Sequence, residues 1–254
     1  MIDALVAHPS QTVILFDYDG SLAPIVDLPE DAVALPAAID ALRRLVGSIG
    51  RIGIVSGRPV EFLAARVNVP DLVFAGLYGM ELMVDGERRV EPEVLAFGEA
   101  VARAADEAEA RLPGVYVERK AGVSVTVHWR TTPGRANDVL AVAADLAQRH
   151  GLAELRTRAA VELRPPVAID KGHAVDALIR GFDVAAFAGD DTGDLPAFAA
   201  LARAADDHRL RRAVRIGVHS SEMPDTLPAA VDGLVTGPEG LAEMLTEVAR
   251  RLGV

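Results

Sequence analysis

Two aspartates lie two positions apart at the end of a continuous run of apolar residues. The run covers residues 12–16, Asp17 and Asp19 follow it, and Gly20 comes next. Because side chains two apart on an extended strand point the same way, we expect both carboxylates on one side of the chain, with Gly20 permitting a sharp exit. At about 4 Å such a pair repels by roughly 1 kcal/mol in water, and by several times more in a partly buried site. The pair therefore needs a cation or a shared proton.

A second group of acidic residues follows another apolar run. Asp190 and Asp191 come after residues 184–188, and Asp194 lies three positions further on. If the two runs are neighbouring strands of one sheet, four or five carboxylates meet at one edge, and such hard oxygen ligands suit Mg²⁺ rather than zinc. The alternative is ordinary turn chemistry, since Asp and Gly are common where strands end. Either interpretation fits one cluster alone, whereas the presence of both favours a metal site.

Lys171 and Ser56 offer groups that bind a phosphoryl group. An ammonium gives a compact positive charge, and a hydroxyl beside backbone N–H groups near a helix start gives hydrogen-bond donors. The chain has two lysines, Lys120 and Lys171, and the other 24 of its 26 basic residues are arginine. In a sequence that so strongly prefers arginine, we interpret lysine as kept where a compact ammonium matters. The alternative for either lysine is chance survival.

These residues lie at the ends of elements that alternate between strand and helix. Apolar runs at 12–16, 51–55 and 72–75 predict buried parallel strands, and helical spacing over 36–46 and 60–67 predicts the helices between them. This order predicts an α/β fold with a parallel sheet and right-handed crossovers. Ligands of open α/β sheets bind at the carboxyl ends of the strands, which is where these polar residues lie.

The middle of the chain has a different pattern, and we interpret residues 88–166 as an inserted α+β domain. The first pattern resumes after it, so residues 1–87 and 167–254 are predicted to form one core. The elements predicted for the insertion are helices at 92–112 and 134–150, a hairpin around Ala121 and Gly122, and a strand at 160–164.

Composition narrows the class of protein. The 254 residues are half hydrophobic and one quarter charged, which predicts a globular chain with a sizeable core. A formal charge of −11 disfavours nucleic acid as a partner, and the lack of cysteine excludes disulfides, thiolate catalysis and Cys-ligated metals. No apolar run has membrane-spanning length and the first residues lack a basic start, so we expect a cytoplasmic protein without a membrane partner, and a monomer. Residues 209–212, Arg-Leu-Arg-Arg, are interpreted as an exposed helix face.

Polar residues alternate along the predicted strands of the inserted domain. They are Glu118, Lys120, His128, Arg130, Glu162 and Arg164. Donors and acceptors mixed at fixed spacing are what binding the hydroxyls of a sugar needs. The alternative is a solvated sheet face. Trp129 alternates to the opposite face, where we expect it to pack under a helix.

Four stretches of the sequence resemble the ordered motifs of haloacid dehalogenase-type phosphatases. They are residues 17–25, which begin Asp-Tyr-Asp-Gly, residues 56–58, Ser-Gly-Arg, residues 171–172, Lys-Gly, and residues 189–191, Gly-Asp-Asp, with Asp194.

The resemblance implies a Rossmann-like core with an inserted cap domain, and it implies a role for each matching residue. Asp17 would be the nucleophile that forms an aspartyl-phosphate, and Asp19 the acid and base. Ser56 and Lys171 would bind the phosphoryl oxygens. The implied Mg²⁺ ligands are Asp17, Asp190 and the carbonyl of Asp19, and Asp191 and Asp194 would orient Lys171 or metal-bound water.

Four further stretches are similar to motifs of trehalose-6-phosphate phosphatases. They are residues 76–81, 118–120, 128–130 and 162–165. The similarity implies hydrolysis of trehalose 6-phosphate to trehalose and phosphate. The substrate contacts that it implies are Arg58, Glu118, Lys120, His128, Arg130 and Glu162.

The sequence departs from the family pattern in two places. Leu195 and Pro196 replace two acidic residues of the last motif, and Tyr78 stands where histidine is common. These differences leave two alternatives open. One is a phosphatase for another sugar or cyclitol phosphate, and the other is a catalytically silent relative that binds a sugar phosphate.

Overall fold

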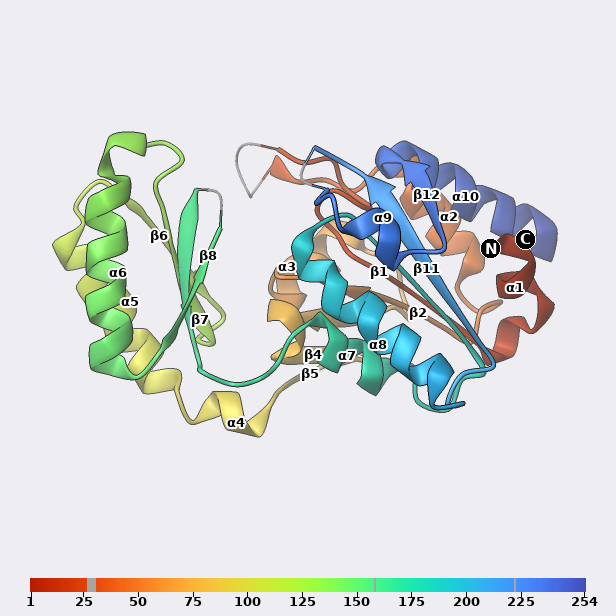
Figure 1. The fold of residues 1–254 in the computed structure, drawn as a ribbon, viewed down its shortest axis with the longest axis horizontal. Helices are drawn as coiled ribbons and strands as arrows, with labels where there is room; N and C mark the ends of the chain where they lie inside the picture. Colours follow the sequence, from red (N-terminus) through yellow and green to blue (C-terminus); the bar gives the residue numbers. More distant parts are fainter. Residues whose placement is uncertain (27–30, 158, 222) are drawn as a thin grey trace. The chain divides into compact units, whose positions relative to one another are not determined.

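The chain consists of two compact units (Figure 1). The computed structural model describes residues 1–26, 31–157, 159–221 and 223–254. The larger unit comprises Met1–Arg89 and Ile169–Val254, and the smaller unit comprises Val90–Ala168. Each boundary lies two residues further along the chain than the sequence interpretation placed it.

The larger unit is built around an eight-stranded sheet (Figure 1). Its strands are β1 (Thr12–Phe16), β2 (Arg51–Val55), β3 (Val73–Gly76), β4 (Glu81–Val84), β5 (Glu87–Val90), β10 (Val184–Gly189), β11 (Arg212–His219) and β12 (Gly233–Thr236). Their order in the sheet is β12-β11-β10-β1-β2-β3-β4-β5. The pairs from β12 to β3 are parallel, and β4 runs antiparallel to β3. The predicted α/β fold with a parallel sheet is thus confirmed.

Helices cover both faces of this sheet. On one face lie α1 (Ile2–Ala7), α2 (Pro36–Leu45), α3 (Val60–Val67) and α10 (Gly237–Leu252), and on the other α7 (Lys171–Leu178), α8 (Leu195–Asp206) and α9 (Leu227–Ala230). A strand covered on both sides must be apolar throughout, and all five residues of β1 are buried. Short 3₁₀ helices lie at Pro9–Gln11, Leu77–Gly79 and Thr192–Asp194.

The smaller unit is a four-stranded sheet with helices on one face. Its strands are β6 (Tyr116–Lys120), β7 (Ser124–His128), β8 (Ala153–Arg156) and β9 (Ala160–Arg164), and its helices are α4 (Pro92–Leu95), α5 (Gly98–Arg111), α6 (Ala136–His150) and the 3₁₀ helix Pro133–Arg135. The strands pair antiparallel in the order β6-β7-β9-β8. Val125 and Val127 of β7 share a hydrophobic cluster with α5 and α6, and Trp129 packs against it on the face that the alternation predicts.

The helix expected over residues 92–112 is two helices, α4 and α5. The Phe97 N–H donates to the carbonyl of Val94, three residues back, at 3.0 Å. This bond closes a tighter turn than that of an α-helix and ends α4. The stretch is rich in Ala, Glu and Arg, which all favour a helix, so the sequence gives no sign of the break between α4 and α5.

Residues 209–212 do not lie on a helix, contrary to the sequence interpretation. Helix α8 ends at Asp206, and β11 begins at Arg212. The N–H groups of Arg211 and Arg212 donate to the carbonyl of Asp183 at 2.8 and 3.1 Å and lead the chain into the strand. The start of β11 cannot be recognised from the sequence, because charged residues lie among the first residues of the strand and only its later residues form an apolar run.

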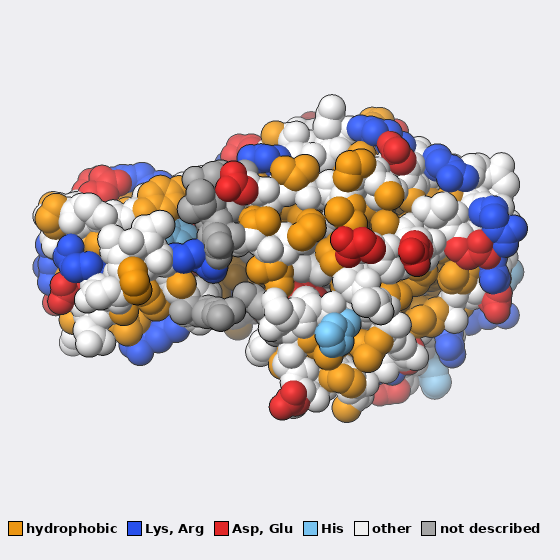
Figure 2. Space-filling model, turned by 90° about the horizontal axis from the view of Figure 1, so that it is seen from above, with side chains coloured by type: hydrophobic (Ala, Val, Ile, Leu, Met, Phe, Trp, Pro, Cys, Tyr) orange, Lys and Arg blue, Asp and Glu red, His pale blue; other side chains and the backbone are white. Residues whose placement is uncertain are grey.

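The described helices include none with both the length and the apolar character of a membrane-spanning segment. On the face of the molecule in Figure 2, acidic and basic side chains are interspersed over the described residues.

Candidate active site

Three neighbouring strands of the larger unit end at the same edge of its sheet. In the sheet, β1 lies between β10 and β2, and all three run parallel. Asp17 follows β1, Ser56 follows β2 and Asp190 follows β10. The Asp17 N–H donates to the carbonyl of Ala188 at 2.8 Å, which holds the chain to β10 as it leaves β1. The register of the sheet thus brings together polar residues that are far apart in the sequence.

Lys171 bridges two buried carboxylates at this edge. It is the first residue of α7, and its Nζ lies 2.6 Å from Asp17 Oδ1 and 2.6 Å from Asp194 Oδ1. All three side chains are buried. The Asp170 carboxylate caps α7 by accepting a hydrogen bond from the His173 N–H at 3.0 Å, which fixes the helix start that carries the ammonium.

Burial and charge together set the ionisation of this cluster. Burial raises the pKa of Asp17 well above its usual range, and the nearby Lys171 only partly opposes the rise. Burial also disfavours the charge on Lys171, but the Asp17 and Asp194 carboxylates outweigh it and raise the pKa of the ammonium well above its usual value. Lys171 is therefore protonated, and full ionisation of Asp17 needs further positive charge nearby.

Asp190 accepts hydrogen bonds from two serine hydroxyls. Ser220 Oγ donates to Asp190 Oδ2 at 2.7 Å, and Ser21 Oγ donates to Asp190 Oδ1 at 3.3 Å. Burial raises the pKa of Asp190 to about 7, the hydrogen bond from Ser220 opposes the rise, and the Asp194 carboxylate adds to it. Near neutral pH, this carboxylate is poised between its protonated and ionised forms.

The carboxylates at this edge fit a hard divalent cation. Asp17, Asp190 and Asp194 each place an oxygen within 4.8 Å of the other two. Lys171 supplies one positive charge against three carboxylates, so ionising all of them leaves negative charge uncompensated in a buried place. Oxygen donors of this kind suit Mg²⁺.

Asp194 already has several partners and organises the loop after β10. Besides Lys171, it accepts hydrogen bonds from the N–H groups of Asp190 and Asp191 at 2.7 and 3.1 Å. Asp17 and Asp190 are thus the better candidates for direct metal ligands. Asp191 Oδ1 is buried and has no hydrogen-bond partner among the described residues, which fits a neighbouring water or ion.

Gly20 leaves room for the Asp190 carboxylate. Its φ is +80°, and a Cβ atom at this position would lie 2.1 Å from Asp190 Oδ2. Both the left-handed backbone and the lack of space require glycine here.

The Asp19 carboxylate is bound by Arg58. Arg58 Nε and Nη2 donate to its two oxygens, each at 2.8 Å, in a bidentate pair. The guanidinium also lies 4.8 Å from the centre of the Phe62 ring. This carboxylate is not among the three that gather around Lys171, so its proposed part in a metal site rests on its backbone carbonyl.

A strained turn holds the loop that contains Ser56. Leu77 and Tyr78 both have left-handed backbones, with φ of 49° and 63°. Such conformations cost on the order of 1 kcal/mol or more for each residue and persist where the surroundings enforce them. The Leu77 N–H donates to the Arg58 carbonyl at 3.0 Å and the Tyr78 N–H to the Ser56 carbonyl at 2.9 Å. A Cβ atom on Gly57 would lie 2.8 Å from the Tyr78 ring.

The polar residues predicted on the smaller unit pair with one another. Lys120 Nζ lies 3.2 Å from Glu162 Oε2, and Ser124 Oγ donates to Glu162 Oε1 at 2.5 Å. His128 Nε2 lies 2.9 Å from Glu118 Oε2. These groups share one face of the sheet, opposite the face that α5 and α6 cover.

Arg130 follows β7 as an exposed residue, two positions beyond His128 at the end of that strand. It therefore lies at the border of the polar face.

Sequence reasoning missed the two serines that contact Asp190. Ser220 directly follows β11 and so occupies the same kind of position as Asp17, a polar residue after a strand of the sheet. The signal was present, but the strand itself was not recognised. Ser21 lies in the turn after Gly20, where serine is ordinary, and its contact with Asp190, 169 positions away, has no local signal.

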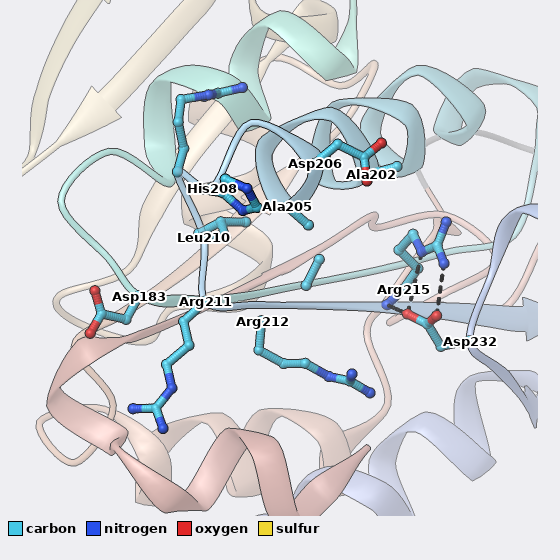
Figure 3. Close-up of a pocket in the computed structure, with 12 residues that line it drawn as sticks. Asp183, Ala202, Ala205, Asp206, His208, Leu210, Arg211, Arg212, Arg215 and Asp232 are labelled. Atoms are coloured by element: carbon cyan, nitrogen blue, oxygen red, sulfur yellow. Dashed lines mark hydrogen bonds and ion pairs between the residues drawn. The ribbon is translucent and has the colours of Figure 1, made fainter.

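A pocket of about 770 Å³ lies at the opposite edge of the same sheet (Figure 3). The end of α8 and the start of β11 line it. Arg215 pairs with Asp232 at 2.8 Å, and Arg209 pairs with Asp176 at 3.0 Å. The mixture of acidic and basic side chains distinguishes this pocket from the carboxylate cluster at the other edge.

Sequence comparisons relate the chain to phosphatases. The family model described as trehalose-phosphatase matches residues 15–227. A trehalose-phosphate phosphatase of Mycobacterium bovis (strain BCG / Pasteur 1173P2) is 33% identical over 264 residues, which cover 99% of this chain and 64% of that protein. The protein of the same name from Mycobacterium marinum is 32% identical over 94% of this chain and 62% of its own length. The chain thus spans less than two thirds of these relatives.

Solved structures share the fold. A crystal structure described as a trehalose-6-phosphate phosphatase related protein has a TM-score of 0.74 and 24% identity, over 94% of this chain and 97% of that one. The C-terminal domain of the C. albicans trehalose-6-phosphate phosphatase has a TM-score of 0.75 and 21% identity, over 98% of this chain and 95% of its own.

Proposed function

Because the chain belongs to the trehalose-phosphatase family, we propose that it hydrolyses trehalose 6-phosphate to trehalose and phosphate. The observation that carries the proposal is the buried cluster at the carboxyl edge of the larger sheet, where Lys171 Nζ lies 2.6 Å from both Asp17 and Asp194. An ammonium for the phosphoryl oxygens lies there directly beside a carboxylate that can act as nucleophile.

The proposed metal site consists of Asp17, Asp190 and the backbone carbonyl of Asp19. Bound there, Mg²⁺ would neutralise negative charge on the phosphoryl group. The raised pKa values of Asp17 and Asp190 support the proposal. Burial disfavours the ionised form of both carboxylates, and a bound cation would lower both pKa values again and stabilise that form. Asp194 holds Lys171 and the loop after β10 in place.

In the proposed reaction, the phosphoryl group passes through Asp17. The Asp17 carboxylate attacks phosphorus, the bond to the sugar oxygen breaks, and Asp19 gives that oxygen a proton. Asp19 then takes a proton from water, which attacks the aspartyl-phosphate and regenerates Asp17. The proton that Asp19 gives in the first step is thus recovered in the second.

Arg58 and Ser56 are proposed to bind the phosphate ester. Arg58 holds the Asp19 carboxylate as an ion pair in the chain without substrate. A phosphate dianion competes for the same guanidinium, so its arrival would free Asp19 to carry a proton. The Ser56 hydroxyl lies in the loop that leads to Arg58, whose N–H donates to Ser56 Oγ at 3.3 Å.

The polar face of the smaller unit is proposed to recognise the sugar. Its groups combine carboxylates, an ammonium and an imidazole, which together accept and donate hydrogen bonds to many hydroxyls. The residues proposed for this role are Glu118, Lys120, His128, Arg130 and Glu162.

A steady-state comparison of three substrates tests the choice of sugar. We expect a higher kcat/KM for trehalose 6-phosphate than for glucose 6-phosphate or sucrose 6-phosphate. Equal values for the three would contradict the assignment of the disaccharide while leaving a phosphatase in place.

The Asp17→Asn variant tests the chemistry. It keeps the shape of the side chain but removes the nucleophile, so we expect Mg²⁺-dependent release of phosphate from p-nitrophenyl phosphate to fall by about a thousandfold or more. Comparable activity in the variant and the parent protein would rule out an aspartyl-phosphate at this position.

A further inference from the structure

The polar face of the smaller unit contains a buried hydroxyl without a partner. The Thr126 side chain lies on β7 and only 4% of this residue is exposed. Its Oγ1 atom has no hydrogen-bond partner among the described residues. Since buried hydroxyls are normally paired, this one needs an explanation.

Thr126 occupies the middle of the polar face. In the register of the sheet, Glu118 of β6 lies opposite Thr126, and Glu162 of β9 lies opposite it on the other side. Side chains directly opposite one another on neighbouring strands have Cβ atoms about 5 Å apart and point to the same face. Thr126 therefore lies between two carboxylates in a row that crosses three strands.

The neighbouring polar groups form hydrogen bonds with one another and none with the Thr126 hydroxyl. Ser124 and Lys120 both donate to Glu162, and His128 pairs with Glu118. Glu162 thus has partners on β6 and β7, and Glu118 has one on β7, while the hydroxyl between them has none in the described chain.

The folded state alone does not account for a threonine here. Valine has nearly the same shape, is as good a strand former, and would bury no unpaired hydroxyl. The opposite face of the same strand uses Val125 and Val127. The chain therefore keeps an unpaired hydroxyl at the centre of the polar face at a cost in stability.

We propose that Thr126 determines specificity for the sugar, with its hydroxyl forming a hydrogen bond to a hydroxyl group of the substrate. This inference rests on the proposed function and adds a residue to it. A neutral donor and acceptor between two carboxylates suits an uncharged, hydroxyl-rich ring, because Glu118 and Glu162 would repel a phosphate group. Because the hydroxyl is buried in the chain without substrate, the proposal requires that neighbouring side chains of the polar face move when the sugar binds.

Three variants test the proposal. Thr126→Val removes the hydroxyl and keeps the shape, and Thr126→Ser keeps the hydroxyl. Thr132→Val is the matched control, because Thr132 Oγ1 is also buried and without a partner among the described residues, but it lies in the turn after Trp129, outside the sheet. The measured quantity is kcat/KM for trehalose 6-phosphate divided by kcat/KM for p-nitrophenyl phosphate, which has no sugar.

We expect Thr126→Val to lower this ratio by about tenfold, mainly through a higher KM for the sugar phosphate. Thr126→Ser and Thr132→Val should stay within about threefold of the parent protein. Thermal unfolding of Thr126→Val should occur at the same or a higher temperature, which separates a lost contact from a damaged fold. A ratio that stays within about twofold of the parent protein in Thr126→Val overturns the proposal.

Failure of the proposed function is recognised separately, in the parent protein. If that protein does not prefer trehalose 6-phosphate over glucose 6-phosphate and sucrose 6-phosphate, the substrate assignment fails. In that case calorimetric titration with trehalose, sucrose and glucose decides the role of Thr126. The inference expects one of these neutral sugars to bind, and to bind about tenfold more weakly to Thr126→Val. Binding of none of them, or equal binding by both proteins, overturns it.

Discussion

The Asp190 side chain shows how strongly one ionisation state depends on its surroundings. Burial raises its pKa to about 7, against an ordinary value near 4. Because the folded-state value is the higher one, this group stabilises the metal-free protein below about pH 4 and loses that contribution as the pH rises through about 7. Mg²⁺ binds the ionised form of Asp190, so the stability that the metal adds should increase as the pH rises.

We therefore expect Mg²⁺ to raise the unfolding temperature by several degrees at pH 8 and by much less at pH 5. Differential scanning fluorimetry with and without the metal measures both shifts. In Asp190→Asn, which has no carboxyl group to titrate, the difference between the two pH values should shrink. An Mg²⁺ effect of equal size at both pH values would contradict a ligand role for Asp190.

Whether an individual site residue can be predicted from the sequence depends on the element that precedes it in the chain. Asp17 and Asp190 follow uninterrupted apolar runs, so the sequence predicts that they meet at one sheet edge if the two strands are neighbours. The structure places β1 beside β10 and brings both carboxylates together near Lys171. The pairing of Asp19 with Arg58 has no such signal, because it depends on side-chain geometry across a turn. Thr126 was overlooked because threonine is common in strands for reasons of conformation alone.

At the scale of elements, the strained turn at residues 77–79 and the loop at 56–58 depend on one another. A Cβ atom on Gly57 would press on the Tyr78 ring. We expect Gly57→Ala to displace Ser56 and Arg58 and to lower kcat/KM for p-nitrophenyl phosphate by on the order of tenfold or more. A second substitution, Tyr78→Gly, removes the ring and also relieves the left-handed backbone.

The double variant should therefore regain most of the activity that Gly57→Ala loses. The same assay measures all three proteins, and Tyr78→Gly alone serves as the control. If the second substitution brings no recovery, the damage does not come from contact with Tyr78, and the close approach has no part in holding the loop.

The sequence predicts best those strands that are buried on both faces along their whole length. Strands β1, β2 and β10 are covered on both faces and appear as apolar runs. The edge strand β5 consists largely of charged residues, and the outer strand β8 has only four residues, Ala-Glu-Leu-Arg. The sequence reasoning recognised neither strand. Strand β5 has no apolar periodicity, and the alternation of apolar and charged residues in β8 spans only four positions.

At the scale of the whole molecule, the two units have separate hydrophobic clusters. One cluster contains residues of α5, α6 and the four-stranded sheet, and the other two lie on the faces of the larger sheet. Separate cores need not unfold together. Trp129, the single tryptophan, belongs to the smaller unit and reports on it alone.

We expect Mg²⁺ to raise the unfolding temperature of the larger unit and to leave that of the smaller unit unchanged. Calorimetry should show the shift, whereas the midpoint from tryptophan fluorescence should stay in place. Equal shifts of both signals would mean that the units unfold as one.

The place of β1 in its sheet bears on the order in which the protein folds during synthesis. The partner of β1 on one side, β10, is translated long after it, and Lys171 follows Asp17 by 154 positions. On the ribosome, β1 to β5 emerge while one side of β1 is still open, whereas the smaller unit is contiguous and needs no later residue. We infer that the smaller unit folds first. Until β10 has been synthesised, the larger unit stays incompletely folded, with the apolar strand β1 exposed on one side. Chaperones bind chains that expose apolar surface in this way.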